Sequence, residues 1–244
     1  MILKTGQMKF KGKERVQFEP YAMKLIEDVN LYEIQKLQEF VYDRLPQKEV
    51  LVTDSIQTMA KDLKEGGFVL GVYNGCEQLV AYRFVTFPKQ IEHNLGMDIA
   101  LGDHELQQVA HLETTLVHPA YRGNSFQSET LAQALPIIES RGYRHVLSTV
   151  SPLNPYSLYN VMHHGLRIKA LKRKYALSEK DSGLWRFILH RDLQAGQQKR
   201  PVDWLHIGIH ELERQVDMLH EGFVGTWLDR DASALQYVKY NASI

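Results

Sequence analysis

One short segment of the sequence combines residue types that suit the binding of a phosphate group. It stands between an apolar stretch that ends at Val117 and a helical pattern of apolar residues. Glycine and other small residues let the backbone turn tightly there, and the first N–H groups of the helix have no partners inside the helix. Those donors, the helix dipole and a charged arginine together attract phosphate; the alternative is a capped helix beside an exposed arginine. The segment consists of Arg122, Gly123, Asn124, Ser125, Phe126 and Gln127.

This segment, with the residues just before it, resembles the acetyl-CoA-binding segment of the GNAT superfamily of N-acetyltransferases. The pattern of that family is (Arg or Gln)-x-x-Gly-x-(Gly or Ala), and Arg122 matches its first position. Ser125 stands where the first glycine is expected, and Gln127 stands at the final Gly or Ala. Serine is small enough for the backbone still to approach a pyrophosphate, whereas Gln127 is bulkier than the residues of the pattern.

A second segment carries the same resemblance. Asn154-Pro155-Tyr156-Ser157, followed by Gly165-Leu166, is similar to the later Asn-x-x-(Ser or Ala) helix of the family, which ends in Gly-Phe. The two segments occur in the family's order, and the resemblance covers about residues 23–190.

The resemblance implies that acetyl-CoA is a co-substrate and indicates where it binds. The pantetheine part would pair with backbone groups near Leu116 and Val117, and the pyrophosphate would lie on residues 122–127. Asn154 and Ser157 stand at the positions of the later helix that belong to the cofactor site.

The implied chemistry needs a base, because an amine must be neutral to attack a thioester carbonyl. Members of the family often take this base from the strand before the cofactor loop. His111 and Glu113 are two residues apart in that segment and therefore share one face of a strand. Burial would raise the pKa of Glu113 toward a useful range. The alternative is that the two residues form a structural pair or face solvent.

The family's usual acid is a tyrosine four residues before the glycine that ends the later helix, and this sequence has Val161 there. Tyr159 on the same helix is the candidate that remains for protonating the departing thiolate, with a packing role as the alternative. Water can also supply this proton, so the loss of the tyrosine does not exclude catalysis.

Composition argues against several other classes of protein. Lys and Arg number 29, as do Asp and Glu, and a zero net charge argues against a dedicated nucleic-acid binder. Cys76 is the only cysteine, which excludes a disulfide framework, and the histidine spacings predict no metal site. No apolar run is long enough to cross a bilayer, and the N-terminus lacks a secretory pattern. We therefore expect a cytoplasmic protein without a membrane or nucleic-acid partner.

Hydrophobic periodicity and turn residues predict the elements that position these residues. Helices are expected over 31–45, near 53–67, from the 122–127 turn to 142, and over 154–164. Strands are expected over 23–29, 68–73, 79–87, 109–117, 145–150, 166–177 and 184–190, with a loop over 88–108. This order predicts an α/β fold with a mixed sheet and helices on both faces, consistent with a GNAT-like acyltransferase fold.

The predicted organisation places a segment on either side of the main domain. Residues 1–22 are expected to form an N-terminal arm or short strand, and residues 23–192 the GNAT-like domain. Residues 200–244 are expected to be a folded C-terminal extension with a strand over 202–209, a helix over 211–220 and strands over 223–228 and 235–240. Its apolar residues would pack on the main domain or on a second subunit, so a homodimer is one possible assembly.

The sequence therefore predicts an enzyme that moves an acetyl group from acetyl-CoA to a primary amine of a small molecule or peptide by direct attack. The alternative is a non-catalytic binding or regulatory module of the same fold, with or without the ability to bind CoA.

Overall fold

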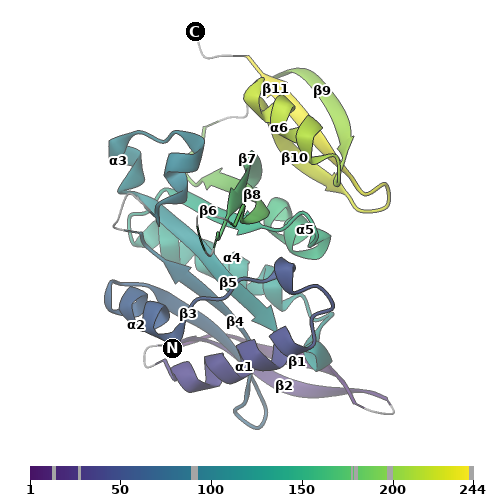
Figure 1. Cartoon of the computed structure of the whole chain (residues 1–244). Coiled ribbons are helices and arrows are strands. Elements are labelled where there is room, and N and C mark those ends of the chain that lie inside the picture. Colours follow the sequence, from purple (N-terminus) through teal and green to yellow (C-terminus); the bar gives the residue numbers. More distant parts are fainter. Residues whose placement is uncertain are drawn as a thin grey trace. The chain divides into compact units, whose positions relative to one another are not determined.

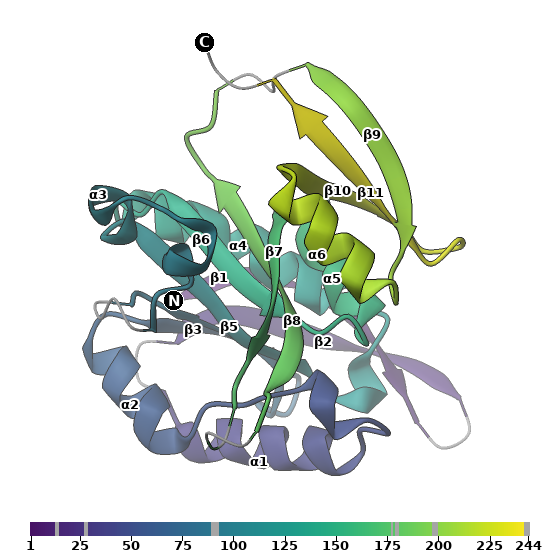
Figure 2. The same ribbon diagram turned by 45° about the horizontal axis from the view of Figure 1, so that its top comes forward.

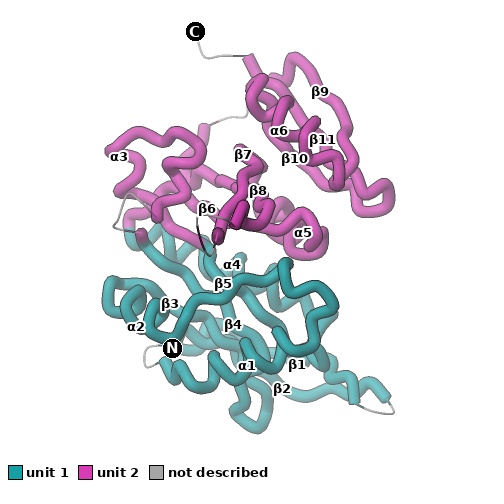
Figure 3. The backbone as a smooth tube through the Cα atoms, in the orientation of Figure 1, with its two compact units in different colours: residues 1–87, 112–141 teal, residues 88–111, 142–244 magenta. Residues whose placement is uncertain are grey.

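The computed structural model describes residues 1–12, 15–26, 29–88, 93–176, 178, 181–196 and 200–241, whose strands and helices are shown in Figures 1 and 2. The chain divides into two compact units, coloured separately in Figure 3. The first unit comprises Met1–Phe87 and Leu112–Arg141, and the second comprises Pro88–His111 and Gly142–Ile244. Strand β5 (Val109–Val117) belongs to both, because the boundary lies between His111 and Leu112.

The first unit is built on strands that are neighbours in the chain. Strands β1 (Ile2–Lys11) and β2 (Val16–Ile26) form an antiparallel hairpin. Strand β3 (Phe68–Asn74) pairs antiparallel with β2 and with β4 (Leu79–Thr86), and β5 follows β4 in the sheet order. Three helices and two short 3-10 turns complete this unit: α1 (Leu31–Asp43), η1 (Lys48–Val50), α2 (Ile56–Lys64), η4 (Pro119–Tyr121) and α4 (Phe126–Ser140).

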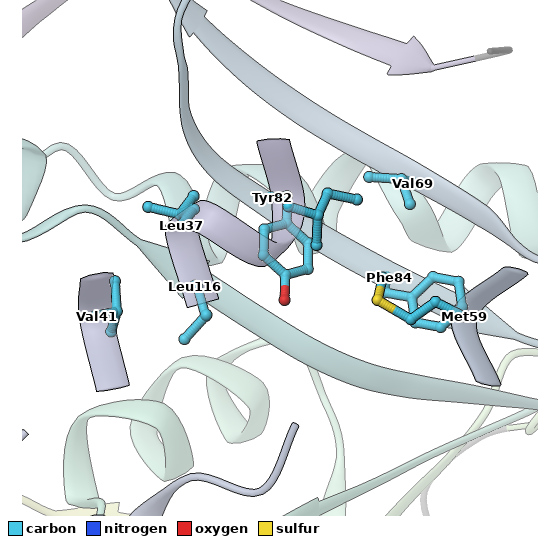
Figure 4. Close-up of a cluster of buried hydrophobic side chains, with 8 residues drawn as sticks. Leu37, Val41, Met59, Val69, Tyr82, Phe84 and Leu116 are labelled. Carbon is cyan, nitrogen blue, oxygen red and sulfur yellow. The ribbon is translucent and has the colours of Figure 1, made fainter. Parts of the chain in front are cut away.

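Side chains that alternate along β4 separate the two faces of this sheet. Tyr82 and Phe84 are buried in a cluster with residues of α1 and α2, including Leu37 and Met59 (Figure 4). Arg83, which stands between them, is buried on the opposite face and bonds to the start of α4. Helices therefore cover both faces, as the sequence predicts.

Local capping explains where the first two helices begin. The Asn30 side chain accepts a hydrogen bond from the Tyr32 N–H, and the Ser55 hydroxyl accepts one from the Thr58 N–H. Asn and Ser are favoured at this position because they satisfy donors that the helix leaves unpaired. Both helices start where the sequence predicts, and α1 ends at Asp43, slightly before the predicted end.

The second unit carries its own run of antiparallel strands. Their order in the sheet is β6 (His145–Val150), β8 (Leu184–Asp192), β7 (Arg167–Lys174), β10 (Phe223–Asp229), β11 (Ala234–Tyr240) and β9 (Pro201–Gly208). Its helical elements are η3 (Leu95–Ile99), α3 (Asp103–Leu106), α5 (Pro155–His163) and α6 (Leu212–His220). Its core includes Leu95, Val109, Leu147 and Ile188.

Strands β9, β10 and β11 and helix α6 lie in the predicted C-terminal extension and belong to this unit. Strand β10 pairs with β7 where Gly225 lies opposite Ile168. A Cβ at Gly225 would lie 2.9 Å from the Ile168 side chain, so glycine permits the close approach of the two strands. Helix α6 also packs on β7, and α5 packs on β10.

Two segments differ from the prediction. The first twenty residues, expected to be an arm or short strand, form β1 and part of β2, because β2 supplies the partner that a lone strand lacks. Residues 88–108, expected to be a loop, contain η3 and α3. The predicted strands over 23–29 and 166–177 end at Ile26 and Lys174, and residues 27–28 and 177 lie outside the described part.

The α/β class is confirmed, and the domain boundaries at residues 22 and 192 remain predictions. Among the described residues, no helix combines the length and apolar character needed to cross a membrane.

Candidate functional site

The turn between β5 and α4 keeps a backbone suited to phosphate although its glycines are few. Gly123 has a φ of +87°, and Ser125 has a φ of +59° and a ψ of +17°, which is left-handed. Glycine adopts this region at no steric cost, whereas serine is strained there. The position where the family pattern has glycine thus retains a glycine-like conformation in Ser125. Arg122, Gly123 and Ser125 are exposed.

Asn124 fixes this turn to the N-terminal strand. Its Oδ1 accepts a hydrogen bond from the Lys9 N–H at 2.7 Å, and its Nδ2 donates to the Lys9 carbonyl at 2.7 Å. The same Nδ2 donates to the Tyr121 carbonyl at 2.9 Å. The side chain of Asn124 therefore holds the turn through β1 rather than pointing toward a ligand.

The side chain of Phe126 is buried and packs edge-on against Tyr21 at 5.1 Å between ring centroids. Gln127 is half-buried, and its backbone carbonyl accepts a hydrogen bond from Arg83. Leu116 is buried against α1 and α2, so only its backbone is available to a pantetheine chain, and Val117 is half-buried.

Glu113 lies in an acidic environment within the first unit. Its Oε1 accepts a hydrogen bond from the Thr86 hydroxyl at 3.0 Å. Asp54 lies just before α2, and the charge of Glu113 acts on its carboxyl group. Burial, together with repulsion from the charges of Glu113 and Asp62, raises the pKa of Asp54 to about 7. A carboxyl group with this pKa gains and loses its proton near neutral pH.

The sequence did not single out Asp54 as a functional residue. It was used only as part of the signal for the start of α2. Glu113 lies on β5, far from Asp54 in the chain. Only the folded structure places the two carboxylates near enough for the charge of Glu113 to raise the pKa of Asp54. The sequence near Asp54 gives one hint of a functional role: an acidic residue follows a largely apolar stretch and stands directly before a helix.

His111 is buried in the second unit, and its Nε2 accepts a hydrogen bond from the Leu95 N–H at 3.1 Å. This contact places the ring proton on Nδ1 and occupies the nitrogen that a base would use. The geometry favours the structural role for His111. Its role as a base remains a prediction.

The residues of the later helix also lie in the second unit. The Asn154 side chain accepts a hydrogen bond from the Ser157 N–H at 3.1 Å and so caps α5. Val161 is buried in the position of the usual tyrosine. The Tyr159 ring lies 6.0 Å from the Trp227 ring and 5.0 Å from the Arg230 guanidinium. Tyr159 therefore belongs to an aromatic cluster, which is the packing role weighed for it.

The structure thus distributes the predicted site residues over the two units. Glu113, the backbone at Leu116 and Val117, and the turn 122–127 follow one another in the first unit, together with Asp54. His111, Asn154, Ser157 and Tyr159 belong to the second unit. Among the described residues, no group of three or more His, Cys, Asp or Glu side chains is placed to hold a metal ion.

Neither a protein-family model nor a curated protein sequence matches the chain. Solved structures do match. An acetyltransferase of the GNAT family from Streptococcus pneumoniae is 13% identical, with a TM-score of 0.52 over 70% of this chain and 99% of that one. The ribosomal-protein-S18-alanine N-acetyltransferase from Escherichia coli is 13% identical, with a TM-score of 0.52 over 74% of this chain and 98% of that one.

A GNAT-superfamily phosphinothricin acetyltransferase from Sinorhizobium meliloti, solved in complex with acetyl-CoA, is also similar. It is 13% identical, with a TM-score of 0.52 over 74% of this chain and 94% of that one. At such identities a structural likeness concerns the fold. The chain has the fold of the GNAT acetyltransferases, as its two motif-bearing segments predict.

Proposed function

We propose that the chain is an acyl-CoA-dependent N-acyltransferase that moves an acetyl group from acetyl-CoA to a primary amine. The observation that carries this proposal is the carboxylate pair of Asp54 and Glu113. The pKa of the Asp54 carboxyl lies near 7, so this group is suited to hold a proton at neutral pH, whereas an ordinary carboxylate is a weak base.

The turn after β5 fits the phosphate part of acetyl-CoA. It offers an exposed Arg122, an open space beside Gly123 where a Cβ would meet nothing within 4 Å, and the first turn of α4. The pantetheine chain would pair with the backbone at Leu116 and Val117. Asn154 and Ser157 are proposed cofactor residues on the strength of the motif that they match.

The proposed reaction is a direct transfer. The nitrogen of the bound amine attacks the thioester carbonyl carbon, forming a C–N bond, and the C–S bond breaks as CoA leaves. We assign the proton that the nitrogen loses to Glu113, whose Oε1 accepts a hydrogen bond from the Thr86 hydroxyl. Asp54 is the neighbouring carboxyl group, with a pKa suited to hold that proton at neutral pH. The departing thiolate takes a proton from water or from Tyr159. No covalent enzyme intermediate is required.

The same two carboxylates favour a cationic acceptor. An ammonium ion beside Glu113 and Asp54 relieves the repulsion between them, which stabilises the bound substrate before its proton is removed. We therefore infer a primary amine of a small molecule or peptide as the acceptor.

The first test is thermal unfolding with acetyl-CoA, with CoA and without ligand. A ligand at 100 times its Kd adds about 2.7 kcal/mol to the free energy of unfolding. For a chain of this size we expect a rise in Tm on the order of 5–10 °C. No shift at millimolar ligand would overturn the proposal.

The second test is release of free CoA with a panel of primary amines. Glu113→Gln should lower kcat by roughly 100-fold or more, because it removes the proton acceptor without changing its shape. Glu139→Gln is the matched control, since Glu139 is exposed near the end of α4, and it should keep wild-type activity.

Two observations favour the alternative of a binding module without transfer. Val161 is buried where the usual acid stands, and Gln127 departs from the cofactor pattern. A protein that gains stability with CoA yet cleaves no thioester with any amine would be such a module.

A further inference from the structure

Arg83 is the bulkiest of the fully buried side chains, with 2% of its surface exposed. It lies in the middle of β4, between two residues that pack into the core under α1 and α2. A charged residue in this position is costly, because taking a charge out of water carries a penalty of several kcal/mol. A physical reason for its presence is therefore required.

The Arg83 guanidinium bonds to the first turn of α4. Its Nη2 donates to the Gln127 carbonyl at 2.8 Å, and its Nε donates to the Thr130 hydroxyl at 3.2 Å. The Thr130 hydroxyl in turn donates to the Phe126 carbonyl at 2.7 Å. These acceptors are all neutral.

No carboxylate of the described residues balances this charge. Within the described part of the chain Arg83 forms no salt bridge, and burial alone lowers its pKa to about 9, with no acidic group opposing the shift. A guanidinium with this pKa is still protonated at neutral pH. Arg83 is therefore a buried cation without a counter-charge from the residues that the structure describes.

The surroundings of α4 add further positive potential. The helix dipole places partial positive charge at its first turn, and Arg122 lies just before that turn. Glu129, the acidic residue of the first turn, forms a salt bridge with Lys4 of β1. The acidic residue of this first turn is thus already paired with a cation.

Hydrogen bonds at the carbonyl end of a peptide unit polarise its N–H end. Arg83 donates to the carbonyl of Gln127, and Thr130 donates to that of Phe126, so two successive peptide units of the first turn are polarised. Their N–H ends point toward the helix N-terminus, where a phosphate would lie.

We propose that Arg83 is a positioning residue that supplies, from beneath α4, the counter-charge for the pyrophosphate of the CoA co-substrate. This inference rests on the proposed function. It assigns part of the phosphate affinity of the CoA site to a residue outside the 122–127 segment. It also accounts for a loop whose sequence departs from the glycine pattern at Ser125 and Gln127, because a buried cation adds to the anion binding that the backbone of the turn supplies.

The test compares CoA with pantetheine, which lacks every phosphate, by calorimetric titration of the whole chain. Arg83→Met should weaken CoA binding about 10-fold or more, while pantetheine binding changes by less than about 2-fold. Arg83→Lys, which retains a cation, should restore most of the preference for CoA. A purely structural role would weaken both ligands together.

Arg141→Met is the matched control. Arg141 follows the other end of α4 and also donates to a backbone carbonyl, that of Gly66 at 2.7 Å. It should leave the ratio of the two affinities unchanged. If Arg83→Met does not fold, Thr130→Val replaces it; this variant keeps volume and charge but removes the hydroxyl link, and should lower the ratio by about 2- to 5-fold.

The outcomes separate the two proposals. Wild-type protein that binds no CoA overturns the proposed function. Wild-type protein that binds CoA, together with Arg83 and Thr130 variants that keep the full ratio of CoA to pantetheine affinity, overturns the role of Arg83 and leaves the proposed function standing.

Discussion

The left-handed conformation of Ser125 is a local cost within the proposed phosphate turn. We expect Ser125→Gly to raise the free energy of unfolding by about 0.5–1 kcal/mol, because glycine adopts a φ of +59° without strain. Urea unfolding measures this change. The same substitution brings the segment closer to the family pattern, so CoA affinity should stay equal or increase.

Gly123→Ala is the opposite substitution in the same turn. A Cβ at Gly123 meets nothing within 4 Å, yet its φ is +87°, so the expected loss of about 1 kcal/mol comes from backbone strain alone. An unchanged stability for both variants would mean that this turn relaxes and that its backbone is not fixed.

Asp54 should reveal itself through the dependence of stability on pH. Its pKa is about 7 in the folded chain and near 3.8 when unfolded, so the folded state binds more protons between these values. The contribution of the protonated Asp54 carboxyl to the free energy of unfolding is fully present below about pH 3.8 and is lost as the pH rises through 7. Asp54→Asn should therefore be more stable than wild type at pH 8, by about 1–3 kcal/mol, and should match it near pH 4.

Urea unfolding at pH 4, 6 and 8 checks this difference, with Glu139→Gln as an exposed carboxylate control. A stability difference between Asp54→Asn and wild type that is independent of pH would show that Asp54 is not the group that titrates. Loss of activity in the same variant, without loss of stability, would support its role beside Glu113.

At the level of elements, the side chain of Asn124 bonds the turn 122–127 to strand β1. Asn124→Ala removes the hydrogen bonds to Lys9 and Tyr121, and we expect a loss of about 1–2 kcal/mol. Amide hydrogen exchange should accelerate in β1 more than in β3. Gln35→Ala, which removes an exposed amide bonded to Glu39, is the control. An equal change of the exchange rates in β1 and β3 on Asn124→Ala would contradict the link between β1 and the turn.

The main elements could be predicted from sequence because their signals are local. The caps at Asn30 and Ser55 and the apolar periodicity that follows them are contained within a few residues. Strand β1 was harder to predict, because its lysines and weak apolar pattern resemble a solvated arm, and only the pairing with β2 makes it a strand of the sheet. The short helical elements within 88–108 were missed for a related reason, since a single turn carries almost no periodicity.

The candidate site could be predicted only in part. The turn 122–127 and Glu113 follow from a motif and a spacing. Asp54 and Arg83 could not be assigned roles, because each acquires its character from burial and from partners far away in the chain. A charged residue inside the apolar stretch of β4 was visible in the sequence, but its contact with α4 depends on the fold.

At the level of the whole molecule, each compact unit contains a titrating group whose effect on stability opposes that of the other. In the second unit the His145 Nδ1 and the His190 Nε2 lie 3.0 Å apart, and the His145 Nε2 lies 3.7 Å from Glu105. Burial lowers the pKa of both rings, and that of His190 falls to about 4 with help from the charges of His145 and Lys169.

For His190 the unfolded chain, with a pKa near 6.5, binds more protons than the folded chain as the pH falls. The stability from the neutral pair is therefore present above pH 6.5 and is lost toward pH 4, whereas that of Asp54 is gained over much of the same range. We expect His190→Gln to match wild type at pH 8 and to exceed it by about 1–2 kcal/mol at pH 5, relative to any constant cost of the substitution. His210→Gln, at an exposed position of the same unit, should show no such trend.

Because the pH dependences of Asp54 and His190 offset each other, the stability of wild type should vary less with pH than that of either Asp54→Asn or His190→Gln. Parallel pH profiles for all variants would refute this compensation and leave the histidine pair as an ordinary part of the core.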